Sequence, residues 1–600
     1  MKALRRKVSL LTAVVSALAW SATPVAAQSV TPVSTSSATG LEPPVKLEEF
    51  KVTDQQDAYK GNTAITGTKT DVPLIDVPAP IQVITKELIE DMGAVDITDL
   101  YPLMGSVTEF SYGGVSMRGF RMTPDPTRYN GIAGNPYNDF DVATLHNVEQ
   151  VEVLKGPVGL LYGDNEPGGM MNIVTAKPKA TFGGSVRLNL GSYQSRGGGV
   201  TVTGPIDAKK RFLYLFTASY LDRDTFRNNY HQEKLNLTGS LTWVITEATR
   251  FNVEVEDITN KQPGARIRGV PFLAFTSTGA LAPANTPGGR FMAPLSHSAT
   301  EPTDFQNLYT TVYSGRLDHA FSSRLRLNAY LRWFASEAHQ AYHEGNLLVA
   351  PAFRLQQREF RHQLRENEEM SWAVNLIGDY EILRTRHKLL GGVEYSKVNR
   401  VFTSLTIPAA RIPTLDVLAP VYGRSSRDMY SVSLASVVPN DTDKIRTGLY
   451  LQDQMSIGER WRIMAGLRHE SYDDERRTPS VDKFDDSVLT YRGAIGFKIR
   501  SNIMAYYSYA MGLKPQTLGD EDRNGPFPPQ ESDSHEVGFK WDLFDQRLNL
   551  TASTYQMRKT NILERDPTPG VPSTWLAPVG EVTSKGFEFD VSGQIKLTSR

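Results

Sequence analysis

The sequence predicts a transmembrane antiparallel β-barrel with an N-terminal mixed α/β plug domain in its lumen. Apolar and polar residues alternate along long segments after Thr181, and the loops between these segments are alternately short and long. Strands of soluble sandwiches average about 5–6 residues, whereas membrane strands need about 9–11 or more. A glycine-rich run of strands and turns, residues 148–178, precedes the alternating part and predicts a compact folded unit.

Composition limits the class of protein. The chain has 600 residues, of which 40% are hydrophobic and 22% charged, as in many soluble proteins, but its 25 Tyr, 25 Phe and 47 Gly also suit a barrel. The part after residue 27 has no apolar window long enough for a membrane helix, which excludes a helical membrane protein. The net charge of −1 gives no reason to expect nucleic-acid binding. The lack of cysteine excludes disulfides, thiol nucleophiles, thiolate metal sites and a lipoprotein anchor.

The N-terminus predicts export. Four basic residues among the first seven precede an apolar run over residues 8–20, and Val25-Ala26-Ala27 provides small residues for cleavage, so residues 1–27 form a signal peptide. The alternative, a membrane anchor, fails because the apolar run is too short. Residues 28–70 form a flexible periplasmic segment, which begins with a stretch rich in Ser, Thr, Pro and Ala.

A short strand pattern follows within that segment, at residues 47–53. Apolar and polar side chains alternate there apart from one slip, in the order Leu47, Glu48, Glu49, Phe50, Lys51, Val52 and Thr53. Such a strand can add to the sheet edge of another protein through main-chain hydrogen bonds. A plain edge strand is the alternative interpretation.

Local patterns define the plug domain, residues 71–180. Residues 81–85 form a strand, Thr85 caps a helix that reaches Met92, and Gly93 ends that helix. A second helix begins at Asp96, with Asp99 as the reciprocal acid of a capping box, and residues 115–120 form another strand.

The run at residues 148–178 reads as strand, Gly-Pro turn, short apolar segment, glycine-rich turn and strand. A phosphate loop is excluded because Gly163 is followed by Asp164 and not by Lys and Ser or Thr. The run resembles the plug hallmark of TonB-dependent outer-membrane receptors, in particular their ferric-siderophore branch. The strings KGP, LYG, PGG and NIVT carry this resemblance, and Lys155 and Ala176 are mild departures from it.

Weaker resemblance extends into the barrel, through GLRHES at Gly466, SHEVGFK at Ser534 and SKGFEFDVSG at Ser584. The alternation predicts sixteen strands over residues 181–600, beginning near Ser185 and ending near Lys596. We expect long loops at residues 257–304, 336–365, 401–443 and 513–531, and a solvated acidic loop at residues 473–475. Because the resembling transporters close at about 22 strands, the barrel is expected to be C-terminally truncated here.

The candidate ligand site lies in the plug segment 121–140. Aromatic and amide side chains there suit a bulky, oxygen-rich iron chelate, and the resemblance places such loops at the external apex. The predicted ligand-binding residues are Arg121, Tyr129, Asn130, Asn135 and Tyr137. The alternative is that several of them only pack the loop. Arg118 is expected to be structural and to pair with acids of the plug or of the barrel wall.

The resemblance implies TonB-dependent active import of a ferric siderophore, with residues 47–53 as the TonB box. It implies TonB, with ExbB and ExbD in the inner membrane, as the energy-coupling partner, outer-membrane lipid around a monomer, and no covalently bound cofactor. No catalytic or metal-binding pattern stands out, so an enzyme is not expected. The alternatives are a receptor for cobalamin, haem or a glycan, or a passive porin or adhesin, which would have no reason to keep a folded plug.

Overall fold

The computed structural model describes residues 59–61, 63–64, 66–110, 114–122, 127–137, 142–264, 269–283, 288–430, 433–516, 527–568, 570–571 and 575–595. The predicted signal peptide and the predicted TonB box at residues 47–53 lie outside these residues. Among the helices of the described part, none has the length and apolar character needed to cross a membrane.

The plug contains two small sheets. The first has the strand order β1 (Ile81–Thr85), β6 (Val148–Lys155), β7 (Gly169–Thr175) and β5 (Thr127–Tyr129), with β5 parallel to β7 and the other pairs antiparallel. The second joins β2 (Val107–Phe110), β3 (Gly114–Met117) and β4 (Phe120–Arg121). Short helices complete the plug, namely η1 (Leu74–Asp76), α2 (Lys86–Asp91), η2 (Ile97–Leu103) and α3 (Gly159–Tyr162).

The predicted helix caps of the plug are confirmed, and one predicted strand is only partly right. The Thr85 side chain accepts a hydrogen bond from the Leu88 amide, and the capping box of Asp96 and Asp99 is present. The expected strand at 115–120 is wrong in one respect, because Arg118 and the following glycine adopt positive φ angles of 50° and 82° and turn the chain between β3 and β4. That turn aims Arg118 away from the sheet.

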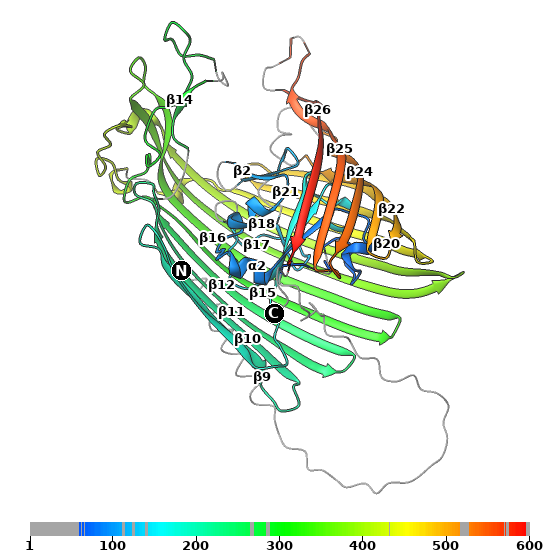
Figure 1. Ribbon diagram of the computed structural model, residues 1–600. Coiled ribbons are helices and arrows are strands. Elements are labelled where there is room, and N and C mark those ends of the chain that lie inside the picture. Colours follow the sequence, from blue (N-terminus) through cyan, green and yellow to red (C-terminus); the bar gives the residue numbers. More distant parts are fainter. Residues whose placement is uncertain are drawn as a thin grey trace, which may run out of the picture. The chain divides into compact units, whose positions relative to one another are not determined.

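The barrel wall contains sixteen long strands within the described residues, as the alternation predicted (Figure 1). They are β8 (Gly183–Leu190), β9 (Arg196–Pro205), β10 (Phe212–Asp224), β11 (His231–Thr246), β12 (Thr249–Pro263), β15 (Phe305–Ser322), β16 (Leu325–Leu348), β17 (Leu355–Ile382), β18 (Thr385–Ile407), β20 (Asn440–Ile457), β21 (Trp461–Thr478), β22 (Asp482–Arg500), β23 (Ile503–Lys514), β24 (Gln530–Leu543), β25 (Leu548–Arg565) and β26 (Leu576–Gly593). Antiparallel registers join each strand to the next.

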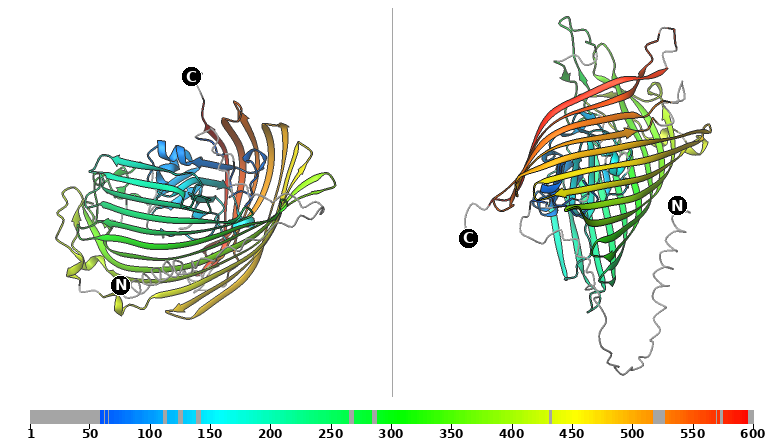
Figure 2. Two further views of the ribbon diagram at one scale, coloured as in Figure 1. Left: turned by 90° about the horizontal axis from the view of Figure 1, so that it is seen from below. Right: turned by 90° about the vertical axis from the view of Figure 1, so that its right-hand side faces the viewer.

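The two faces of the wall differ as the period of two requires. On β11, Lys234, Asn236 and Thr238 are buried, whereas Leu235 and Leu237 are exposed on the opposite face. The plug elements, blue in Figure 2, lie on the concave side of the strands, and hydrogen bonds such as that from Lys234 to Asp96 of the plug join the two. The polar faces of the strands therefore form the lumen, and the apolar faces suit lipid.

Two loop predictions are wrong. Residues 336–365 are not a long loop, because β16 continues to Leu348 and β17 begins at Leu355 in a common ladder. The acidic run at residues 473–475 lies in β21, and the side chain of Asp474 is buried. The regular alternation of apolar and polar residues marks only the lipid-facing band of each strand, whereas the ladders of β16, β17 and β21 continue through these residues.

Two of the remaining long connections contain short elements. They are β13 (Phe272–Leu273) and β14 (Arg290–Phe291) between β12 and β15, and η5 (Ala409–Arg411), β19 (Leu415–Asp416), η6 (Arg427–Met429) and η7 (Leu434–Ser436) between β18 and β20. The opposite ends of the strands are joined by short turns, such as residues 323–324 and 383–384. The predicted sorting of loop lengths is thus confirmed for these connections.

Candidate functional site

The predicted ligand-binding tyrosines are buried in the plug. The ring of Tyr129 lies 4.6 Å from the guanidinium carbon of Arg332 on β16. Tyr137 is 1% exposed, and its hydroxyl lies 2.7 Å from Thr144 Oγ1. Burial raises the pKa of Tyr137 well above its ordinary value, so it is a neutral hydroxyl.

The predicted amides have structural roles. The Asn130 side chain donates to Thr175 Oγ1 and accepts from the Thr175 amide, which fixes the end of β5 against β7. The side-chain Oδ1 of Asn135 accepts from the Tyr137 backbone amide in a local turn. Arg121, at the end of β4, is exposed. The side chains of Tyr129, Asn130, Asn135 and Tyr137 thus make contacts within the protein, and ligand binding by all five predicted residues remains a prediction.

Tyr137 nevertheless borders the lumen. It lines a narrow hollow together with the amide side chains of Asn260 and Gln262 on β12 and of Gln306 and Asn307 on β15. This part of the plug therefore meets a part of the barrel wall that carries amide groups, which can donate to the oxygen atoms of a ligand.

Arg118 fixes the plug to the barrel. Its Nε donates to Glu588 Oε1 at 3.0 Å, and its Nη2 lies 2.8 Å from both Glu588 Oε2 and Glu536 Oε2. Its guanidinium carbon also lies 4.0 Å from the ring centroid of Tyr555. All three charged side chains are buried, so removing one of them would leave an uncompensated charge. The structural role predicted for Arg118 is confirmed.

Lys155, which stands where the resembling family has Arg, joins the same cluster. Its Nζ lies 2.8 Å from Asp590 Oδ2 and 3.5 Å from Glu588 Oε2. The barrel strings around Ser534 and Ser584 therefore contain the carboxylates that hold the plug. The sequence signal for them was their place on the polar face of the strand, but nothing in the sequence paired them with Arg118.

The stretch before β1 is also anchored to the wall. Lys60 pairs with Asp542 at 3.0 Å, and Asp71 accepts from Arg326 and Lys388. Burial alone would raise the pKa of Asp71, but the two cations more than offset it and hold that pKa well below its ordinary range. Lys60 belongs to the segment 28–70 that the sequence predicts to be flexible, so the described end of that segment contacts the wall, and the predicted TonB box lies further toward the N-terminus.

Lys69 of the same stretch enters a buried pair. Its Nζ lies 3.3 Å from Glu394 Oε2 on β18 and 3.1 Å from the hydroxyl of Tyr450 on β20. Desolvation, partly offset by Glu394, lowers the pKa of Lys69 to about 8. The positive charge of Lys69 is therefore balanced by the carboxylate of Glu394 in a site that solvent does not reach.

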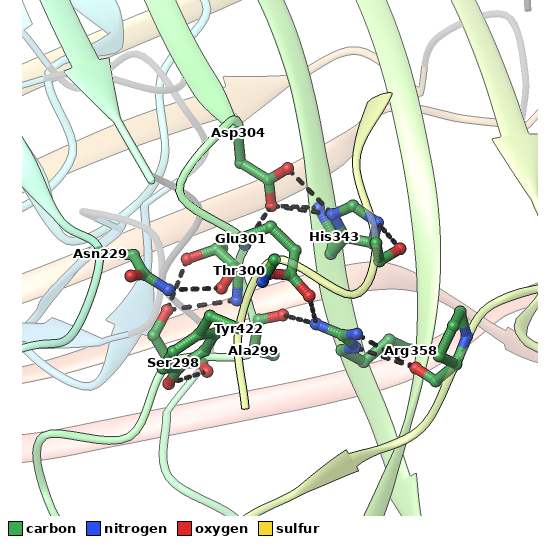
Figure 3. Close-up of polar contacts among 12 residues, drawn as sticks. Asn229, Ser298, Ala299, Thr300, Glu301, Asp304, His343, Arg358 and Tyr422 are labelled. Carbon is green, nitrogen blue, oxygen red and sulfur yellow. Dashed lines mark hydrogen bonds and ion pairs between the residues drawn. The ribbon is translucent and has the colours of Figure 1, made fainter. Parts of the chain in front are cut away.

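A second polar cluster joins the outer ends of β15, β16 and β17 (Figure 3). We call it the outer junction. Arg358 is buried and donates to Glu301 Oε1 at 2.8 Å and to the carbonyl oxygens of Ala299 and Pro413. The other carboxylate oxygen of Glu301 accepts from the Gly423 amide. The connection between β18 and β20 is thereby fixed to the segment that precedes β15.

His343 completes the outer junction. Its Nδ1 lies 2.9 Å from Asp304 Oδ1, and its Nε2 lies 2.8 Å from Ser425 Oγ and 3.0 Å from the Tyr430 hydroxyl. Asp304, His343 and Ser425 resemble a catalytic acid–histidine–serine arrangement, but all three are buried. The cluster therefore holds the loops together and does not expose the serine as a nucleophile. Its members lie in the connection before β15, on strand β16 and in the connection between β18 and β20, so no local sequence pattern indicates it.

No group of three His, Cys, Asp or Glu side chains that could hold a metal ion occurs in the part of the chain that the structure describes.

Comparison with known proteins agrees with this architecture. Residues 180–600 match the TonB dependent receptor-like β-barrel model, and residues 73–170 match the TonB-dependent receptor plug domain. The chain is 28% identical to the metal-pseudopaline receptor of Pseudomonas aeruginosa over 92% of this chain and 78% of that one. It is 24% identical to the ferrioxamine B receptor of Salmonella typhimurium over 91% and 77% of the two chains.

Solved structures show the same fold. The ferric-catecholate import receptor Fiu of Escherichia coli has a TM-score of 0.78 at 18% identity, over 90% of this chain and 81% of that one. A complex of FpvAI with pyocin S2 has a TM-score of 0.80 at 21% identity, over 90% and 70%. The matched family consists of receptors and transporters, not of enzymes, in agreement with the sequence. The chain therefore belongs to the TonB-dependent receptors, plugged β-barrels of the Gram-negative outer membrane.

Proposed function

We propose that this receptor imports a ferric siderophore across the outer membrane, driven by TonB with ExbB and ExbD in the inner membrane. The observation that carries the proposal is a plug held in the lumen by buried ion pairs at Arg118, Lys155 and Lys69. A passive porin would gain nothing from such a plug. Relatives named as ferrioxamine and ferrichrome receptors support an iron chelate as the cargo.

Transport against a gradient needs energy from elsewhere, because the outer membrane holds no ion gradient of its own. A charge that crosses the inner membrane releases about 2.3 kcal/mol per 100 mV. We propose that TonB pulls on residues 47–53 and that the force reaches the wall first at the Lys60 pair with Asp542. The receptor acts as a monomer in this account, with ligand bound at the plug apex and outer loops.

Growth of iron-restricted cells on purified siderophores tests the cargo. Cells with the receptor should grow on at least one ferric siderophore on which cells without it fail. Leu47→Pro and Phe50→Pro each remove a main-chain donor from the predicted TonB box, so they should abolish growth while ligand binding persists. Growth that is identical with and without the receptor on every siderophore would contradict the proposal.

A second cargo follows from one comparison, the metal-pseudopaline receptor. The cargo would then be a chelate of a metal other than iron, and the receptor would restore growth when that metal is restricted and not under iron restriction. The same strains distinguish the two cases.

A further inference from the structure

Two histidines meet on the outer face of the barrel wall. On β16, Arg332 donates to the carbonyl oxygen of Gly134 in the plug, so the even-numbered residues of this part of the strand face the lumen and His339 faces outward. His362 of β17 is paired with Ala341, two residues beyond His339, and therefore lies on the same outward face. The two histidines are thus diagonal neighbours in one ladder.

The histidine pair lies beyond the apolar band of the wall. On the same face of β16, Leu331 is 50% exposed, and the indole of Trp333 donates to Glu368 Oε1 at 2.9 Å. Glu337 is the last outward side chain before His339. The outward side chains therefore change from apolar to charged before the pair is reached, which places the pair on the watery side of the lipid boundary.

The two imidazole rings are held with one nitrogen atom of each facing the other. His339 Nε2 lies 2.8 Å from His362 Nε2, and the rings are stacked with their centroids 5.1 Å apart. The ring of Phe305 on β15 packs edge-on against His339, with 5.1 Å between centroids, and so limits its rotation. Two nitrogen atoms at this distance form a hydrogen bond only if one carries a proton and the other offers a lone pair.

Two carboxylates lie beside the pair. Glu337 acts on His339 as a nearby negative charge, and Glu366 of β17 stands directly opposite Glu337 in the ladder. The residues paired with these two glutamates on the outer neighbouring strands, Tyr309 and Val401, carry no charge. Like charges directly opposite each other destabilise a sheet, so this place favours a bound cation.

A second proton is a poor choice of cation here. It would turn two N–H groups toward each other and place two positive charges side by side. Arg427 already acts on His362 as a nearby positive charge, although it is itself paired with Asp428 at 3.3 Å. A metal ion, in contrast, uses the lone pairs of both Nε2 atoms at once, and the two carboxylates offset its charge.

We propose that His339 and His362 bind one divalent transition-metal ion of the zinc type through their Nε2 atoms. Bonds from zinc to imidazole nitrogen are about 2.0–2.1 Å long, so two such nitrogens at a tetrahedral angle lie about 3.3 Å apart, roughly 0.5 Å more than here. A small rotation of the rings supplies that difference. Water fills the other positions of the ion, and Glu337 is placed to accept a hydrogen bond from one of these waters.

The chemistry of the pair also sets the choice of metal and the strength of binding. Imidazole suits zinc, copper and nickel, whereas magnesium and calcium prefer oxygen ligands. Nδ1 of His362 is buried and has no hydrogen-bond partner among the described residues. A metal-bound imidazole without such a partner binds about 10- to 100-fold more weakly than a supported one. The bound ion would link the outer ends of β16 and β17, away from the plug and the cargo.

Equilibrium dialysis of the purified receptor against Zn²⁺ tests this, with a receptor that carries no polyhistidine tag. We expect one zinc ion per receptor, which Mg²⁺ does not displace. His339→Gln and His362→Gln should each weaken that binding at least about tenfold, because either change removes one of two ligands. The double variant should bind no more weakly than either single variant. His362→Cys supplies a thiolate ligand and should keep zinc bound, which separates loss of a ligand from loss of packing.

His469→Gln is the matched control. His469 is an exposed histidine of β21 whose paired residues on the neighbouring strands are Leu449 and Leu489, so it has no second imidazole beside it. Its loss should leave zinc binding unchanged.

Hydrogen exchange places the ion in the structure. With free zinc at 100 times its dissociation constant, amides of β16 and β17 around the pair should exchange up to about 100-fold more slowly, and this protection should vanish in His339→Gln. Absence of zinc binding by the parent receptor would overturn the proposal, and so would equal zinc binding by the parent, His339→Gln and His362→Gln. Import of a ferric siderophore does not depend on either result, since the pair contacts neither the plug nor the lumen.

Discussion

Replacing Arg118 with methionine should loosen the plug in the barrel. The change keeps an apolar stem but leaves the carboxylates of Glu536 and Glu588 buried without the cation that lies 2.8 Å from both. Breaking a buried pair in this way costs roughly 3–5 kcal/mol. Since 1.4 kcal/mol is a factor of ten, the open form of the plug should become roughly 10²- to 4 × 10³-fold more populated.

Native-state hydrogen exchange of the purified receptor measures that population. Amides of β2, β3 and β4, which flank Arg118, should exchange faster in Arg118→Met by the factor above, while barrel amides keep their rates. Lys177→Met is a matched control, because Lys177 is 36% exposed and lies 3.7 Å from Glu254, so its loss should cost under about 1 kcal/mol. Equal exchange rates in the two variants would refute the argument that the buried cluster holds the plug.

Three further changes test other parts of the structure. Arg358→Met removes the cation of the outer junction, which should cost roughly 3–5 kcal/mol locally, and faster proteolysis of residues 408–439 on intact cells would show it. At Gly163, where φ is +65°, the Cβ of Gly163→Ala would collide with the buried carboxylate of Glu470. Gly423→Ala is the control, because φ is +83° there but no atom lies within 4 Å of the added Cβ. Gly163→Ala should therefore lower the melting temperature more than Gly423→Ala, and equal melting temperatures would contradict this. The pKa of Asp71 in the folded protein lies below the ordinary value of 3.8. The stability that the Asp71 carboxylate contributes is therefore fully present above pH 3.8 and is lost as the pH falls towards the folded pKa. Asp71→Asn should therefore destabilise the plug at neutral pH, with a difference from the parent that shrinks below pH 4 in urea unfolding; a constant difference would contradict the linkage.

The sequence predicted the elements better than their contacts. Thr85 and Asp96 cap helices where expected, since caps depend on residues three positions apart. The number of strands was also predicted correctly from the alternation of apolar and polar residues, because each strand repeats that alternation over many residues. The prediction of a loop at 336–365 is wrong because the outer ends of β16 and β17 remain paired and contact the distant connection between β18 and β20. The local sequence pattern does not reveal that contact.

The candidate site was harder to predict for the same reason. Tyr137 and Asn130 have the side chains that a ligand would need, but their hydrogen bonds go to Thr144 and Thr175. Composition of a segment cannot show which polar groups the fold has already used. Arg118 was predictable as a structural residue, whereas its partners lie more than four hundred residues away.

Energy-dependent uptake of a radioactive iron chelate tests the central claim most directly. Cells that express this receptor should accumulate the chelate, and accumulation should stop in cells that lack TonB, in cells whose proton gradient is collapsed, and in the Phe50→Pro receptor, while each still binds the chelate at its surface. Accumulation that continues without TonB, or that needs no receptor, would contradict the account of a plugged receptor opened by TonB.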